Sequence, residues 1–463
     1  MQKKLLFLLS CLLCTFSFSQ SLLIENISII DTEKGKLIKN VHVLIKDSVI
    51  VNISSKKIQP VSVKTIDGSG KYLIPGLWDM HTHIWSDEFY FPLLIANGVT
   101  GVRGMFEDVK NVAAWRKKIA DGKINGPVIF SGGPIVDGPQ PVWPGSVAVK
   151  NPEDGRRAVD SLKNKLHTDF IKVYSLLSRE SYFAIAEECK KQNIPFAGHV
   201  PNLVTVMEAA KAGQKSMEHL YGMIEAASDS SDYYYRLLQG KITDTTLSSR
   251  QQRRKFLLRT YKPENFKRFA KELSQYNSWI CPTLTVNKGI AYMNDSTLLD
   301  DPRMQYMGVF YRNFWDPRKD FRFKTWTDET FAIQREEFKL KLKLVKELHA
   351  AGVKIIAGTD FPNPHCYPGF GIHDELALLV EAGLTPAEAL RTATYNAALF
   401  FGINNRYGTV AKNKMADLLI LDANPLEDIS STKKINSVIF QGKLINKDEL
   451  KGLLDKAKKM AGQ

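Results

Sequence analysis

The sequence predicts an α/β protein: a (β/α)8 TIM barrel with a small composite β-sandwich domain built from both ends of the chain. Three observations lead to this prediction. Of the 463 residues, 44% are hydrophobic, enough for one or two buried cores. Short apolar runs alternate with amphipathic stretches through the middle of the chain, and strand-like runs return near both ends. The expected parts are 20–75 and 403–446 for the small domain, 76–402 for the barrel and 447–463 for a helical tail.

The N-terminus predicts a secretory signal peptide over residues 1–19. Two lysines precede the apolar run 5–16, and small residues at 17 and 19 indicate cleavage after Ser19. This run is shorter than the ~20 residues that span a bilayer, and no later run is long enough. We therefore expect an exported protein without stable membrane insertion. A lipoprotein anchored at Cys11 is the alternative.

The small domain is predicted from strands at the two ends. Runs at 22–24, 41–45 and 49–51 are separated by turn residues, and the pattern returns at 418–421 and 437–440. One shared domain explains this arrangement, and two unrelated small sheets are the alternative.

Eight strand-then-helix units fill the middle of the chain, as a (β/α)8 barrel with insertions requires. The predicted strands are 76–83, 99–105, 127–132, 169–174, 195–200, 216–220, 279–286 and 354–360. Residues 225–278 form an insertion that is rich in Tyr, Lys and Arg, and we expect it to be helical. It follows a strand, so it could cover the active-site mouth as a lid. Packing and a contact in a homo-oligomer are the alternatives.

The formal net charge of +14 does not indicate nucleic-acid binding, because Lys and Arg are spread along the chain without a block of five or six like charges. A solvated surface accounts for this charge. The five cysteines are too few and too scattered for a disulfide framework.

Polar residues follow several predicted strands, at the end where such barrels place their active sites. His81 and His83 are two residues apart on the first strand and therefore share a face. Two neutral imidazoles on one face suit a zinc-like cation. His199, His219 and Asp360 end the fifth, sixth and eighth strands. Each alone could be a buried core residue, but together they predict a metal site.

Lys172 lies on the fourth strand, and the alternation of that strand directs it toward the barrel axis. An unpaired buried ammonium is costly. Two explanations are open: an ion pair with a neighbouring carboxylate, or reaction of the neutral amine with carbon dioxide to give a carbamate that bridges two metals.

In combination and in order, these residues resemble the amidohydrolase superfamily, in the branch of prolidase-like and imidazolonepropionase-like metal-dependent hydrolases. The resemblance covers nearly the whole chain after the predicted signal peptide. It rests on the Lys172 strand and on the segments 75–83, 198–199, 218–219, 358–360, 375–390, 393–394, 408–410 and 416–418.

The resemblance implies two zinc ions in one site. His81, His83 and Asp360 would hold one ion, His199 and His219 the other, with carboxylated Lys172 as the bridge. A one-metal site in which Lys172 is not a ligand is the alternative within the family.

The implied function is that of an exported zinc-dependent amidohydrolase. It would cleave amide bonds of a small-molecule substrate, a dipeptide or N-acyl amino acid, with metal-activated hydroxide. Asp360 would carry the proton to the departing amine. A cyclic amide or lactone hydrolase and a catalytically silent binding protein are the alternatives.

Four residues are candidate substrate contacts. Tyr174 and Tyr221 lie close in sequence to ligands and could donate to the oxyanion, although plain packing is the alternative for each. Arg103 could bind a substrate carboxylate, with a structural ion pair as its alternative. His365 follows the eighth strand and could reach the mouth.

Overall fold

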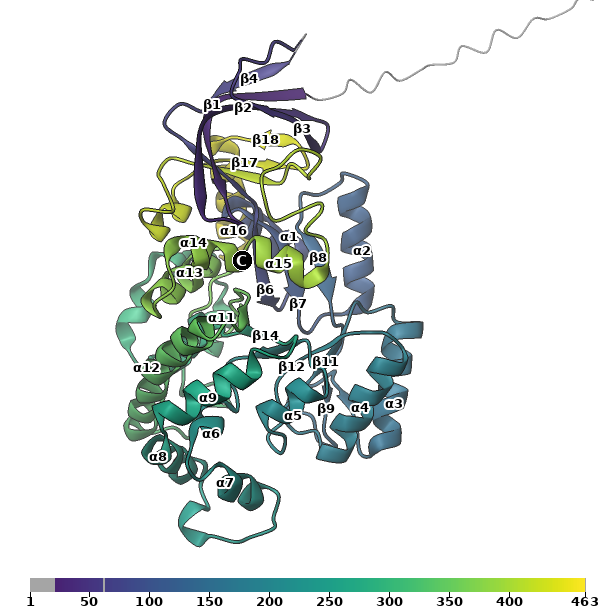
Figure 1. Cartoon of the computed structure of the whole chain (residues 1–463), viewed down its shortest axis with the longest axis vertical. Coiled ribbons are helices and arrows are strands. Elements are labelled where there is room, and N and C mark those ends of the chain that lie inside the picture. Colours follow the sequence, from purple (N-terminus) through teal and green to yellow (C-terminus); the bar gives the residue numbers. More distant parts are fainter. Residues whose placement is uncertain (1–20, 61–62, 463) are drawn as a thin grey trace, which may run out of the picture.

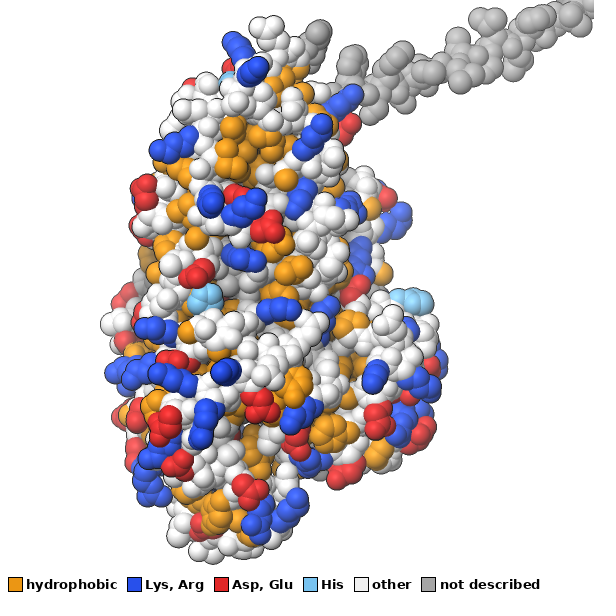
Figure 2. All heavy atoms as spheres, in the orientation of Figure 1, with side chains coloured by type: hydrophobic (Ala, Val, Ile, Leu, Met, Phe, Trp, Pro, Cys, Tyr) orange, Lys and Arg blue, Asp and Glu red, His pale blue; other side chains and the backbone are white. Residues whose placement is uncertain are grey.

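The computed structural model describes residues 21–60 and 63–462. The predicted signal peptide and Cys11 lie outside the described residues. In Figure 1 a small sheet stands above a larger body of strands surrounded by helices. Within the described part, none of the helices is long and apolar enough to span a membrane. On the face that Figure 2 shows, basic side chains are scattered among acidic and neutral ones.

Strands from both ends of the chain share one eight-stranded sheet, with the order β18-β17-β16-β5-β1-β2-β3 and β4 paired to β1. β16 lies antiparallel to β5 and so joins the C-terminal strands to the N-terminal ones. The strands are β1 (Ser21–Asp31), β2 (Lys36–Lys46), β3 (Val49–Ser54), β4 (Lys64–Asp67), β5 (Tyr72–Pro75), β16 (Leu418–Leu421), β17 (Ile435–Phe440) and β18 (Lys443–Ile445).

This sheet differs from the predicted two-sheet sandwich, because it is one sheet that divides along β1. β4 pairs with residues 22–25 of β1, and β5 pairs with Ser28 and Ile29. Between them Asn26 has a positive φ of 57°, and the register with β2 shifts there. Such a bulge bends a strand and increases its twist, which lets one long strand serve both parts of the sheet.

The body contains two parallel sheets. One has the order β6-β7-β8 and the other β10-β9-β11-β12-β13-β14-β15. The strands are β6 (Leu77–Thr82), β7 (Val99–Gly104), β8 (Val128–Ser131), β9 (Val136–Asp137), β10 (Val147–Ala148), β11 (Ile171–Val173), β12 (Phe196–Gly198), β13 (Ser216–Glu218), β14 (Trp279–Cys281) and β15 (Lys354–Ile355). Each of the eight predicted strands contains one of these, and the short β9 and β10 were not predicted.

Backbone hydrogen bonds join the two parallel sheets at both borders. Asp169 N donates to Ser131 O at 2.9 Å on one side. On the other, Met80 N donates to Ala357 O at 2.9 Å and Asp360 N to His81 O at 2.8 Å. The segment after β15 therefore runs beside β6, which brings Asp360 next to His81.

Helices cover the outside of the body, and several of them start at side-chain capping signals. Ser178 caps α4, and Thr327 opens α12 with a capping box. These helices are α1 (Asp87–Ala96), α2 (Val109–Ala120), α3 (Pro152–Asp160), the π-helical turn Ser161–Lys165, α4 (Arg179–Lys191), α5 (Val206–Lys211), α12 (Asp328–Ala350), α13 (Gly371–Glu381), α14 (Pro386–Thr392), α15 (Tyr395–Phe401) and α16 (Lys447–Ala461).

Two insertions extend the body. The first is the helical segment expected at 225–278, with α6 (Met223–Ala227), α7 (Ser231–Leu238), α8 (Arg250–Thr260) and α9 (Pro263–Leu273). α6 to α9 lie in the lower part of Figure 1. The second, between β14 and α12, was not predicted; it holds α10 (Leu284–Ala291), α11 (Val309–Phe314) and 3-10 turns at Ser296–Asp300 and Pro302–Tyr306. Further 3-10 turns lie at Thr245–Leu247 and Ile429–Lys433.

Candidate metal centre

The six predicted ligand residues line one cavity of about 590 Å³. His81 lies within β6 and Lys172 lies within β11. His83, His199 and His219 follow β6, β12 and β13, and Asp360 lies in the segment after β15. Five of the six are buried, and the His83 side chain is 15% exposed. The ends of separate parallel strands therefore bring together residues that are far apart in the sequence.

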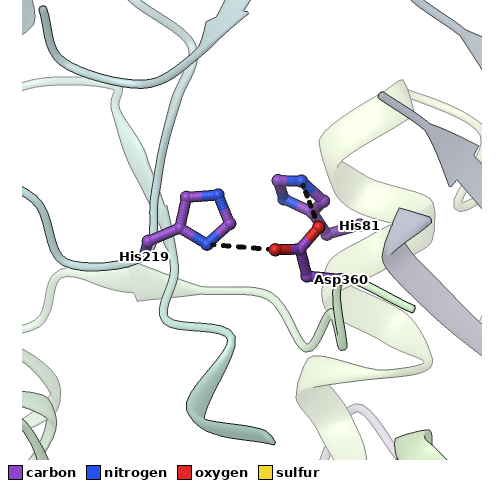
Figure 3. Close-up of side chains that lie close together, drawn as sticks. All are labelled: His81, His219 and Asp360. Carbon is purple, nitrogen blue, oxygen red and sulfur yellow. Dashed lines mark ion pairs between the residues drawn. The ribbon is translucent and has the colours of Figure 1, made fainter. Parts of the chain in front are cut away.

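The carboxylate of Asp360 faces both His81 and His219 (Figure 3). Its Oδ1 is 2.9 Å from His83 Nε2 and 3.3 Å from His81 Nε2, and its Oδ2 is 3.9 Å from His219 Nδ1. The backbone of Asp360 is left-handed, with φ of 68°. A non-glycine residue adopts this conformation at a cost, and such strain concentrates at functional sites.

A second polar group fixes the ring of each of three histidines. His81 Nδ1 lies 2.9 Å from Glu218 Oε2, His199 Nδ1 lies 2.8 Å from Ser175 Oγ, and His219 Nδ1 lies 2.7 Å from Thr283 Oγ1. In each ring Nδ1 is engaged, which leaves Nε2 for a metal. Metal-binding histidines use their other nitrogen in this way.

The electrostatics of the site keep its imidazoles neutral. Desolvation lowers the pKa of His81 to about 4 and the pKa values of His199 and His219 well below the ordinary range. Burial alone would raise the pKa of Asp360, but His81 and His83 lower it, so the carboxylate stays ionised. Neutral imidazoles with an anionic carboxylate are the donor set that a divalent cation needs.

The ion pair that was one explanation for Lys172 is not observed among the described residues. Its side chain is buried and its Nζ has no hydrogen-bond partner. Among residues 21–60 and 63–462, no carboxylate forms a salt bridge with it. Desolvation lowers the pKa of Lys172 to about 8, so the neutral amine that reacts with carbon dioxide is accessible.

Tyr174 and Tyr221 both line the cavity beside the histidines. The Tyr174 ring stacks on His199 with centroids 3.9 Å apart, and its hydroxyl accepts a hydrogen bond of 2.9 Å from Trp143 Nε1. The Tyr221 ring lies 5.0 Å from that of His199 and 5.1 Å from that of His219. Both hydroxyls are within the cavity that a substrate would enter.

Arg103 is not a substrate contact, and the structure corrects that prediction. Its side chain is fully buried and does not line the cavity. Its Nη2 donates to both carboxylate oxygens of Glu218 at 2.9 Å, and its Nε donates to Met80 O at 2.6 Å. The alternative, a structural ion pair, is the one observed. Through Glu218, Arg103 supports the orientation of His81.

His365 also lies away from the cavity, contrary to the prediction. It is buried with its ring 5.3 Å from that of Trp315, and neither ring nitrogen has a partner. The segment after β15 places it against Trp315 of the second insertion, so proximity in sequence to Asp360 does not bring it to the same cavity.

Both insertions contribute to the cavity wall, which the sequence analysis only partly anticipated. Tyr234, Arg250 and Arg254 come from the first insertion, while Phe314 and Arg322 come from the second. The first insertion thus forms part of the cavity wall. Glu218 directly precedes the candidate ligand His219 in the sequence. That Glu218 orients His81 could be recognised only from the fold.

Comparisons with known proteins agree with this site. The Amidohydrolase family pattern matches residues 331–445, which include Asp360. Ochratoxinase of Aspergillus niger is 24% identical over 89% of this chain and 84% of its own. Imidazolonepropionase of Deinococcus deserti is 40% identical over 88 residues, 19% of this chain and 22% of its own.

Solved structures share the fold along nearly the whole chain. Bottromycin amidohydrolase superposes with a TM-score of 0.73 and 21% identity, covering 95% of this chain and 90% of its own. A Xaa-Pro dipeptidase superposes with a TM-score of 0.65 and 20% identity, covering 92% of this chain and all of its own, 100%. Residues 331–445 thus match the Amidohydrolase family, and the chain is similar along most of its length to amidohydrolase-type enzymes, which supports a hydrolase that acts on carbon–nitrogen bonds.

Proposed function

We propose that the chain is an exported, zinc-dependent amidohydrolase that cleaves the amide bond of dipeptides or N-acyl amino acids. The observation that carries this proposal is the convergence of four histidines, Lys172 and Asp360 on one cavity. The names of its relatives and structural neighbours, an ochratoxinase, a dipeptidase and a bottromycin amidohydrolase, support amide-bond chemistry.

We also infer that the two parallel sheets together form the predicted (β/α)8 barrel. The hydrogen bonds from Asp169 to Ser131 and from Met80 to Ala357 support this inference, because they connect the sheets on both sides. A barrel would fix all six ligand residues on rigid elements.

Two zinc ions would be held by this donor set: His81, His83 and Asp360 would bind one, His199 and His219 would bind the other, and carboxylated Lys172 would be a ligand to both. When bound, the ions would lower the pKa of a water molecule and polarise the substrate carbonyl. Asp360 would take the proton from that water and pass it to the departing amine. Tyr174 and Tyr221 would donate to the developing oxyanion, because burial raises the pKa of both phenols and keeps them protonated.

The proposal is tested by amine release from a panel of dipeptides and N-acyl amino acids, with zinc-loaded protein. Turnover that is lost in the chelated protein and restored by zinc would support it. Silence across the panel with zinc bound would contradict the amidase proposal and favour cyclic amides or lactones as substrates.

Replacing Lys172 with Met is expected to reduce zinc from about two ions per chain to one or none, since the bridging group is lost. Elemental analysis of the purified protein measures this content. Growth with ¹³C-bicarbonate should also give a carbamate carbon signal that the variant lacks. Lys341→Met is the matched control, a second buried lysine of the same cavity, and should keep both ions. Two zinc ions in Lys172→Met would exclude the bridge.

Export predicts that the protein recovered from its own host begins at Gln20. Mass spectrometry of the intact mature chain measures this start. A chain that begins at a lipid-modified Cys11 would support the lipoprotein alternative, and a chain that retains residues 1–19 would contradict export.

A further inference from the structure

A guanidinium without a counter-ion lines the cavity at the start of α8. Arg250 is the first residue of that helix, is exposed and faces the cavity. Among the described residues it forms no salt bridge. Its neighbours are engaged: Arg254 pairs with Glu337, and Arg253 donates to the carbonyls of Leu247 and Ser248. Arg250 therefore differs from Arg253 and Arg254, the other α8 arginines that line the cavity, because the guanidinium groups of those two are already engaged.

A second cation lies in the same corner. Lys341 of α12 is 9% exposed, and its Nζ donates to the neutral Asn287 side chain. Desolvation lowers the pKa of Lys341 to about 8, so it is still largely protonated at neutral pH.

The carboxylates of this corner do not balance these charges. Glu337 is occupied by Arg254. Burial raises the pKa of Glu225, which weakens its value as a counter-ion. The corner thus holds an excess of positive charge inside a cavity, where a carboxylate would be bound strongly.

One aromatic ring connects this corner to the candidate metal centre. Lys341 Nζ lies 5.6 Å from the Tyr221 ring centroid, and that ring lies 5.1 Å from the His219 ring. The Arg250 charge also acts on the Tyr221 phenol. Through the Tyr221 ring, Lys341 is therefore linked to the candidate metal centre, and Arg250 lines the same cavity.

We propose that Arg250 and Lys341 form an anion subsite that binds a free carboxylate of the substrate. The inference rests on the proposed function and narrows it: N-acyl amino acids and peptides with an ionised carboxylate are the preferred substrates, and their neutral carboxamides are turned over with a higher KM. Arg250 provides a planar fork for the carboxylate, and Lys341 provides a second charge from the opposite helix.

The test compares one N-acyl amino acid with its carboxamide in zinc-loaded protein. Arg250→Gln should raise KM for the acid at least about tenfold, the size of one lost charge-assisted hydrogen bond, and leave kcat/KM for the carboxamide within about twofold. Arg250→Lys should recover part of the loss. Lys255→Gln is the matched control, since it removes one charge from the exposed side of the same helix.

Equal losses for acid and carboxamide, or an unchanged KM for the acid, would overturn the subsite. If the wild-type protein turns over neither compound, the proposed function fails for this substrate class. Calorimetric binding of the acid to wild type and Arg250→Gln then tests the subsite separately. Affinity that falls about tenfold in the variant would support it, and equal affinity would contradict it.

Discussion

Asp360→Asn should lower kcat/KM by about 10³-fold or more. The substitution keeps the size of the side chain but removes both the anionic ligand and the proton carrier, and general acid–base catalysis alone contributes about 10²–10⁴-fold. The loss should be large because Oδ1 lies close to both His83 and His81, at 2.9 and 3.3 Å. Steady-state amine release from the best substrate of the panel measures it.

Zinc content separates the two roles of Asp360. If Asp360→Asn retains both ions and is inactive, the proton role dominates. If one ion is lost as well, the ligand role contributes. Asp428→Asn is a matched control: Asp428 is exposed, caps a 3-10 turn, and Asn caps equally well. A fully loaded Asp360→Asn that keeps a tenth of the activity would exclude the proposed proton transfer.

Arg103→Met should lower the free energy of unfolding by about 3–5 kcal/mol, the cost of leaving one partner of a buried ion pair uncompensated. Arg103 and Glu218 are both fully buried, and each of the two Glu218 oxygens lies 2.9 Å from Arg103 Nη2. Urea unfolding of the metal-free protein measures the change without a contribution from zinc binding.

The double variant Arg103→Met with Glu218→Leu should be more stable than Arg103→Met alone, because replacing both charges by apolar groups removes the unpaired carboxylate. Lys117→Met is the matched surface control. Lys117 pairs with Asp121 at 3.2 Å but is 76% exposed, so its loss should change stability by less than about 1 kcal/mol. An Arg103→Met protein as stable as this control would contradict a structural role for the buried pair.

The candidate ligands could be predicted because parallel strands follow simple rules. Side chains at strand ends meet at one face of the sheets, and alternation directs Lys172 inward, so His199 and His219 could be placed from local patterns. The strands near both chain ends could also be predicted, because their alternating apolar and polar residues and their turn residues lie within a few positions of one another.

The substrate wall could not be predicted, since it depends on long-range packing. Arg103 was wrongly predicted to contact the substrate. Its partner, Glu218, is 115 residues away in the sequence, so no local pattern indicates the ion pair. The position of Arg250 depends on how two insertions fold over the mouth, and no short pattern encodes that arrangement. The prediction for His365 was wrong for the same reason, because its ring packs against Trp315 of the second insertion.

The pairing of β5 with β16 has a consequence for biosynthesis. While the chain is being made, β5 can join β1, but its other edge stays open until residues 418–421 leave the ribosome. An open edge is a template for pairing with other chains. The nascent protein therefore passes through a long interval in which the open edge of its N-terminal strands, residues 21–75, can pair with other chains. Any truncation that removes β16 would make that vulnerability permanent, although the removed strand contains none of the candidate ligands.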